Sequence, residues 1–147
     1  MNMTGLVIKL PVKVLVFIVL ISFLLFFKGS LEAKVKIISI SNPVYIGIVK
    51  ENITLKQACN NWMIDSDDVV SIFNLSIKYN DEGGIRREFY WLPCEIRGKL
   101  ESNGTEWTFV INAASTSIWK NNEEEIYWGC KKIGCNEFFL LPFDGLK

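Results

Sequence analysis

The chain has 147 residues, half of them hydrophobic, and its 16 lysines and arginines balance its 16 aspartates and glutamates. A zero net charge without a basic region argues against a nucleic-acid-binding protein, because such proteins depend on many phosphate contacts. Histidine is absent, which removes the commonest general base and the commonest metal ligand, so we expect no cofactor.

An apolar segment near the N-terminus determines the expected compartment. Residues 14–27 (VLVFIVLISFLLFF) carry no charge, and Val14, Leu20 and Phe27 mark the beginning, middle and end of this membrane segment. The segment is as long as the hydrophobic region of a signal peptide and shorter than the about 20 residues that span a bilayer. It lacks the apolar stripe of a buried amphipathic helix. The sequence therefore predicts a hydrophobic helix that anchors the chain in a membrane or directs its export.

Two features bear on whether this segment is retained. Lengthening it toward the N-terminus gives a spanning length and includes Lys9 and Lys13, which can reach the headgroups from a helix end. Signal peptidase needs small residues at positions −3 and −1, and cleavage after Ala33 would place a leucine at −3. We therefore favour a signal-anchor over a cleaved signal peptide for residues 1–33, with one extracytoplasmic domain at 34–147.

The first part of this domain predicts strands and helices in alternation. Residues 35–40 and 44–49 are rich in β-branched side chains, which favours two strands. Residues 52–63 fit a helix that Thr54 would cap, with Cys59 on its buried face. Residues 80–84 (NDEGG) have the composition of a loop.

Four residues, 65–68 (DSDD), allow two interpretations. Acidic side chains stabilise the first turn of a helix, so the cluster predicts a second helix that ends near Ser76. A cation site is the alternative. A calcium loop of the EF-hand type also needs a glycine and a distal glutamate at fixed offsets, and the sequence lacks both.

The clearest local signal lies at residues 94–113. Asn103-Gly104 is the favoured pair for a two-residue type I′ hairpin turn. That turn fixes the register, because a slip of one residue would mix the apolar and polar faces. The apolar face then pairs Leu100 with Trp107, Gly98 with Phe109, Ile96 with Ile111 and Cys94 with Ala113, and the other face pairs Lys99 with Thr108, Arg97 with Val110 and Glu95 with Asn112.

The remaining residues predict further strands. Residues 115–119 fit a strand or turn, 121–125 a polar loop, and 126–130 and 137–143 two short strands, the last at a sheet edge because it contains Pro142. The fold class is therefore α+β: an N-terminal hydrophobic helix, one or two short helices, and a mainly antiparallel sheet with the 94–113 hairpin.

Four cysteines complete the pattern: Cys59, Cys94, Cys130 and Cys135. An even count in a short exported chain favours two disulfides, and we favour Cys130–Cys135 together with Cys59–Cys94. A structural zinc is a weaker alternative, since the spacing does not give paired C-x2–4-C knuckles. A catalytic cysteine is weaker still without a histidine partner.

Several short stretches resemble a type of small bacterial exported protein of unassigned function. They are LPCEIRG at 92–98, FVINAA at 109–114, YWGC at 127–130 and FLLPFD at 139–144. Some chains of this build, a short anchor followed by a small disulfide domain, act as immunity proteins that block an antibacterial toxin. The resemblance implies this class and carries over no functional residue.

These observations favour a small, non-enzymatic binding module of the cell envelope, with a protein partner and a membrane contact through the N-terminal segment. The chain contains five tryptophans, a residue type that is enriched at protein interfaces. A structural or accessory envelope protein is the alternative. A hydrolase that uses paired carboxylates from 65–68 or 123–125 is less favoured, because adjacent acids in polar loops seldom differ in burial.

Overall fold

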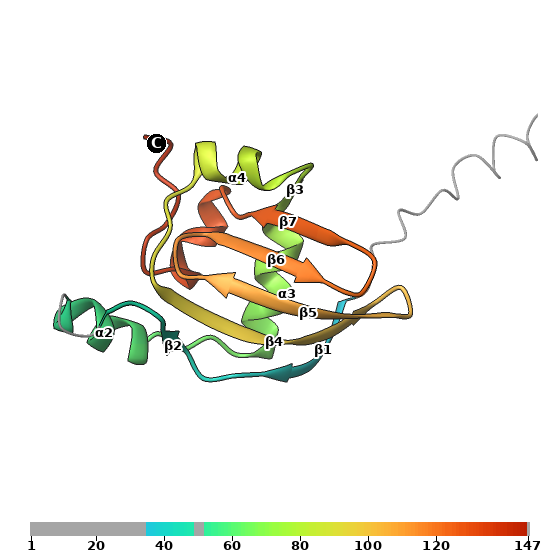
Figure 1. Cartoon of the computed structure of the whole chain (residues 1–147), viewed down its shortest axis with the longest axis horizontal. Coiled ribbons are helices and arrows are strands. Elements are labelled where there is room, and N and C mark those ends of the chain that lie inside the picture. Colours follow the sequence, from blue (N-terminus) through green and yellow to red (C-terminus); the bar gives the residue numbers. More distant parts are fainter. Residues whose placement is uncertain (1–34, 49–51, 147) are drawn as a thin grey trace, which may run out of the picture. The chain divides into compact units, whose positions relative to one another are not determined.

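Seven strands form one antiparallel sheet in the computed structural model, which describes residues 35–48 and 52–146. The sheet order is β1-β4-β5-β6-β7-β3, and the short β2 also pairs with β4 (Figure 1). The elements in chain order are β1 (Val35–Ile40), β2 (Val44–Tyr45), α2 (Ile53–Asn60), α3 (Ser66–Leu75), β3 (Ile77–Tyr79), α4 (Glu82–Glu88), β4 (Cys94–Ser102), β5 (Thr105–Asn112), β6 (Thr116–Lys120), β7 (Glu125–Gly129) and the 3₁₀ helix η1 (Ile133–Phe138). The predicted α+β class with a mainly antiparallel sheet is confirmed.

The predicted membrane segment of Val14, Leu20 and Phe27 lies outside the described residues. Within 35–48 and 52–146, no helix combines the length and the apolar character that a bilayer span requires.

The β4–β5 hairpin has the predicted register. Its pairs run from Glu95 opposite Asn112 to Ser102 opposite Thr105. Both turn residues have positive φ, 51° at Asn103 and 76° at Gly104, as a type I′ turn requires. Glu101 faces Glu106 beside the turn, and an ion pair between Lys99 and Glu106 offsets the repulsion between the two carboxylates.

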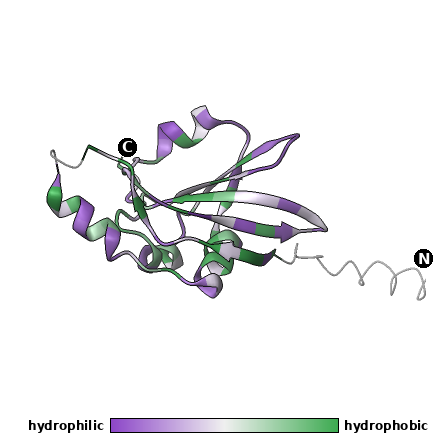
Figure 2. Cartoon of the chain, turned by 60° about the horizontal axis from the view of Figure 1, so that its bottom comes forward, coloured by the Kyte–Doolittle hydropathy of each residue, from purple (hydrophilic) through white to green (hydrophobic). Residues whose placement is uncertain are grey.

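One face of the sheet carries the core. Helix α3 packs on this face, and its buried side chains are Val69, Ile72 and Phe73. The Phe73 ring meets the rings of Phe109 and Trp119 edge-on, with centroids 5.7 and 4.9 Å apart. Figure 2 shows α3 on one side of the sheet and α4 on the other. Because α4 is short, it covers only one end of its face, and we call the rest of that face the open face.

Two disulfides stabilise the domain, one between elements distant in the sequence and one across a tight turn. The long-loop disulfide, Cys59–Cys94, has a sequence separation of 35 and links α2 to the beginning of β4. The short-loop disulfide, Cys130–Cys135, has a separation of 5 and closes the turn between β7 and η1. Both pairings match the prediction, and all four cysteines are buried.

Helix α2 is capped two residues earlier than predicted. Asn52 is the N-cap, and its side chain accepts a hydrogen bond from the backbone N–H of Leu55, so Thr54 already lies inside the helix. Strand β2 is shorter than the predicted 44–49 and ends at Tyr45.

Two further predictions are wrong. The expected 80–84 loop begins helix α4, because the Asp81 side chain caps it by accepting from the Gly84 N–H and Ile85 continues the turn. The expected strand at 137–143 is instead the end of η1 followed by irregular chain. The short-loop disulfide bends the chain here, and the Trp62 indole N–H holds it by donating to the Phe138 carbonyl at 2.7 Å.

Candidate functional site: a groove on the open face

A groove of about 520 Å³ lies on the open face, between α4, the segment before β4, and the middle of the sheet. Its floor comes from Val110 on β5 and Ile118 on β6, which face each other across the two strands. Its walls include Trp91, Glu95 and Tyr127. We call it the open-face groove.

Aromatic side chains form one wall of the groove. Phe89 is 3% exposed, and its ring packs against those of Tyr79 and Phe143, with centroids 5.9 and 5.0 Å apart. The next two residues point outward instead: Tyr90 is 37% exposed and Trp91 is 60% exposed. A tryptophan that leaves most of its surface in water beside a groove is typical of an interaction site.

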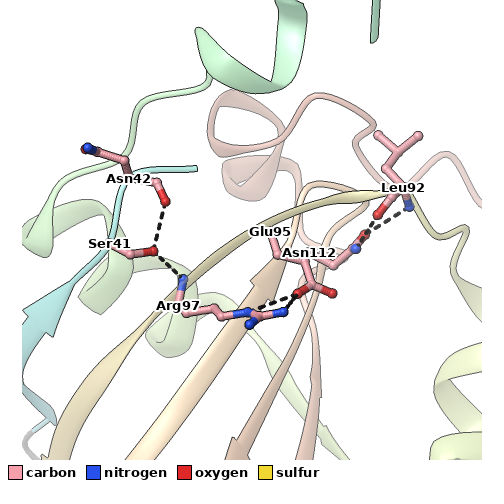
Figure 3. Close-up of polar contacts among 6 residues, drawn as sticks. All are labelled: Ser41, Asn42, Leu92, Glu95, Arg97 and Asn112. Atoms are coloured by element: carbon pink, nitrogen blue, oxygen red, sulfur yellow. Dashed lines mark hydrogen bonds and ion pairs between the residues drawn. The ribbon is translucent and has the colours of Figure 1, made fainter. Parts of the chain in front are cut away.

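Asn112 fixes the segment that carries this wall (Figure 3). Its amide nitrogen donates to the Leu92 carbonyl at 2.6 Å, and its Oδ1 accepts from the Leu92 N–H at 3.1 Å. The same Oδ1 accepts from the Ala114 N–H. Asn112 is itself 6% exposed. The contacts therefore hold the chain beside Trp91 through a buried side chain, which keeps the aromatic wall in one position.

Glu95 supplies a carboxylate to the groove. Its side chain is 14% exposed, and Arg97 donates to its Oε2 from Nε at 3.3 Å and from Nη2 at 3.0 Å (Figure 3). Arg97 itself lies toward the rim, with 59% of its side chain exposed. In residues 35–48 and 52–146, Oε1 of Glu95 has no hydrogen-bond partner. The groove thus contains one half-buried acceptor that remains available.

The β7 side of the groove is polar and ordered. The Tyr127 hydroxyl donates to Glu125 at 2.8 Å, and this hydrogen bond raises the pKa of Tyr127. A hydrogen bond from Lys120, together with that from Tyr127, lowers the pKa of Glu125. At neutral pH the phenol is therefore a donor and the carboxylate is charged. On the α4 side, Glu82 lines the groove and pairs with Arg86 one turn later.

The groove lies at the end of the β4–β5 hairpin away from its turn. Val35, the first described residue, pairs with Ser102 beside the hairpin turn, whereas Glu95 and Asn112 lie at the other end of the hairpin. Glu95 and Ser102 are seven positions apart along β4, which corresponds to about 23 Å.

The acidic clusters found in the sequence do not meet in this groove. Asp65 caps α3 by accepting from the N–H groups of Asp67 and Asp68, and Asp68 returns a contact to the Asp65 N–H, which completes a capping box. In the second cluster, the N–H groups of Glu123 and Glu124 bond to Asn121 in an exposed turn. The structure therefore supports capping over a cation site at 65–68.

Sequence patterns gave only part of the groove. The hairpin register had already placed Glu95 opposite Asn112 on the non-core face, and the structure confirms this pair. Trp91 and Tyr127 were missed as site residues, because an aromatic side chain beside a strand is equally typical of a core. Comparison with known protein families, curated proteins and solved structures finds no match for this chain. Its geometry is therefore what bears on function.

Proposed function

We propose that this chain is a non-enzymatic, extracytoplasmic protein-binding module that docks a protein partner in the open-face groove. More specifically, we propose that it is an immunity protein whose partner is an antibacterial toxin. The observation that most supports docking here is the side chain of Trp91, which is 60% exposed on a segment held by the buried Asn112. Rigid aromatic side chains of this kind contribute most of the binding energy in many interfaces, because little entropy is lost when they dock.

The two disulfides support the extracytoplasmic part of this proposal, because they are compatible with an oxidising compartment outside the cytoplasm.

A carboxylate hydrolase is the second candidate, because Glu82 and Glu95 both line the groove. Each of these carboxylates contacts an arginine, Arg86 or Arg97. A general acid of the glycosidase type usually sits in an apolar setting that keeps it protonated. Neither carboxylate has such a setting, since each pairs with an arginine, and we therefore favour binding over hydrolysis. A structural role in the envelope remains the alternative without a specific partner.

Photocrosslinking tests the proposal. The full chain would carry benzoylphenylalanine at position 91 or, as a control, at the exposed Lys132, which lies in the loop closed by the short-loop disulfide. We expect position 91 to crosslink one protein, identified by mass spectrometry, whose purified form binds the chain at least about tenfold more weakly after Trp91→Ala.

The immunity form adds a second readout. We expect cells that lack the chain to be killed by that crosslinked protein and cells that carry it to survive. Equal adducts at positions 91 and 132, or undiminished binding by the Trp91→Ala chain, would overturn the docking site. A partner without toxicity would overturn only the immunity form.

A further inference from the structure

We infer that the open-face groove recognises a cationic side chain, a lysine or arginine that the protein partner inserts. This inference rests on the proposed protein-binding function and names the chemistry of the contact. The groove combines an apolar floor, an aromatic wall and a carboxylate with one oxygen available.

The carboxylate of Glu95 provides the charge. Both donors of Arg97 use the same oxygen, Oε2, although a carboxylate has two oxygens that can each accept hydrogen bonds. The side chain of Glu95 is 14% exposed, so an incoming cation would meet it in a partly desolvated place, where a charge-assisted hydrogen bond is stronger than at the surface. Arg97 makes no hydrogen bond to Oε1, and 59% of its side chain is exposed at the rim.

The rest of the groove fits the body of such a side chain. Val110 and Ile118 form an apolar floor that can cover the methylene groups of a lysine or arginine. The rings of Trp91 and Tyr127 line the same space, and aromatic faces attract cations at a distance of up to about 6 Å. Glu82, on the α4 side, also lines the groove, but Arg86 in the same lining pairs with it, so the charge available to a partner is that of Glu95.

Small probes can test this chemistry without the partner. We propose to titrate the oxidised full chain, kept in mild detergent because of its apolar N-terminal segment, with three capped amino acids: Nα-acetyl-lysine methylamide, Nα-acetyl-arginine methylamide and Nα-acetyl-norleucine methylamide. The norleucine compound has an apolar chain without the charge and is the matched control. The chain has five tryptophans, so their indole N–H signals in a ¹⁵N spectrum are few, and a Trp91→Phe variant assigns the one that matters.

We expect one or both cationic probes to shift the Trp91 indole signal in a saturable way and the norleucine probe to leave it in place. Comparing the two cationic probes shows whether an ammonium or a guanidinium is preferred. Glu95→Gln should weaken binding of the preferred probe at least about tenfold, because it removes a charged acceptor. Glu137→Gln, at an exposed position in η1, should leave binding unchanged.

Equal binding of the norleucine and cationic probes, or no shift with any probe, would overturn the inference. Undiminished binding to the Glu95→Gln chain would also overturn it. If that variant does not fold, Glu95→Asp withdraws the carboxylate by one methylene and should also weaken binding, and the comparison of probes on the unmodified chain stands independently. If the chain does not bind the cationic probes but still crosslinks one protein through position 91, this inference is overturned and the proposed docking function is not.

Discussion

Replacing Asn112 by alanine should loosen the aromatic wall and destabilise the whole domain. The side chain makes three hydrogen bonds, two with Leu92 and one with the Ala114 N–H, and is 6% exposed. A typical hydrogen bond contributes about 1 kcal/mol, and a buried group left without a partner costs about 1–3 kcal/mol. We therefore expect Asn112→Ala to lower the free energy of unfolding by about 3 kcal/mol, a large part of the about 5–15 kcal/mol typical of a domain.

Asn121→Ala is the matched control. The Asn121 side chain also accepts from two backbone N–H groups, those of Glu123 and Glu124, but it does so in an exposed turn where water can replace it. Its loss should cost less than about 1 kcal/mol.

Urea unfolding of the oxidised chain, followed by far-ultraviolet circular dichroism, measures both variants. Hydrogen exchange of the Leu92 amide should accelerate in the Asn112→Ala chain more than its global destabilisation explains, because the local anchor is lost. Equal costs for the two variants, or a protected Leu92 amide in the Asn112→Ala chain, would refute the assignment of Asn112 as the anchor of the wall.

Three more predictions follow from the packing. Replacing both cysteines of the long-loop disulfide by alanine should lower the free energy of unfolding in urea by about 1.7 kcal/mol more than the same change at the short-loop disulfide. The chain-entropy relation gives about 3.8 kcal/mol for the long loop and about 2.1 kcal/mol for the short one, and the two pairs are equally buried, so the loss of packing is the same for both. Equal costs for the two double variants would contradict this prediction. Gly129→Ala should destabilise the domain by about 1–3 kcal/mol, because the added Cβ would lie 2.5 Å from the Phe89 ring. The Cβ of the control variant Gly134→Ala would meet no atom closer than 3.4 Å and should be tolerated. Similar urea midpoints for the two variants would disprove this prediction. Hydrogen bonds from Tyr79 and Lys131 lower the pKa of Glu88 below its ordinary value of 4.5. The stability that the Glu88 carboxylate contributes is therefore present above pH 4.5 and is lost as the pH falls through the lowered pKa. Glu88→Gln should therefore lower the urea midpoint at pH 7 and change it less at pH 2.5, and a pH-independent difference would count against the pairing.

The hairpin and both disulfides could be predicted because each depends on local chemistry. Asn103-Gly104 admits the two positive φ values of its turn, and period-two alternation then fixes every later pair. The spacing of Cys130 and Cys135 suits a disulfide that closes a tight turn. Once these two are paired, Cys59 and Cys94 are the two that remain for the second disulfide.

Helix α4 and η1 were not predicted because the composition of each stretch favours another structure. Gly83 and Gly84 disfavour a helix by propensity, and the Asp81 cap together with an ion pair between Glu82 and Arg86 compensates for this. The apolar run at 137–143 has the composition of a strand, and only the disulfide at its start and the contact from Trp62 prevent it from joining the sheet.

Only part of the groove could be predicted from the sequence. Register places Glu95 on the non-core face, but sequence does not show whether a helix covers that face. Whether Trp91 is exposed depends on where the chain turns before β4, and Asn112, 21 residues later in the sequence, controls that turn.

The two halves of the open face differ in a way that bears on the proposed docking site. Toward the hairpin turn the face carries cross-strand ion pairs, Lys99 with Glu106 and Lys120 with Glu125, whose charges are well solvated and need no partner. Toward the other end the same face carries Trp91, an apolar floor and a carboxylate with an unoccupied oxygen. Exposed apolar surface of this kind is unfavourable in water until another molecule covers it, which is why we propose docking at the groove rather than across the whole face.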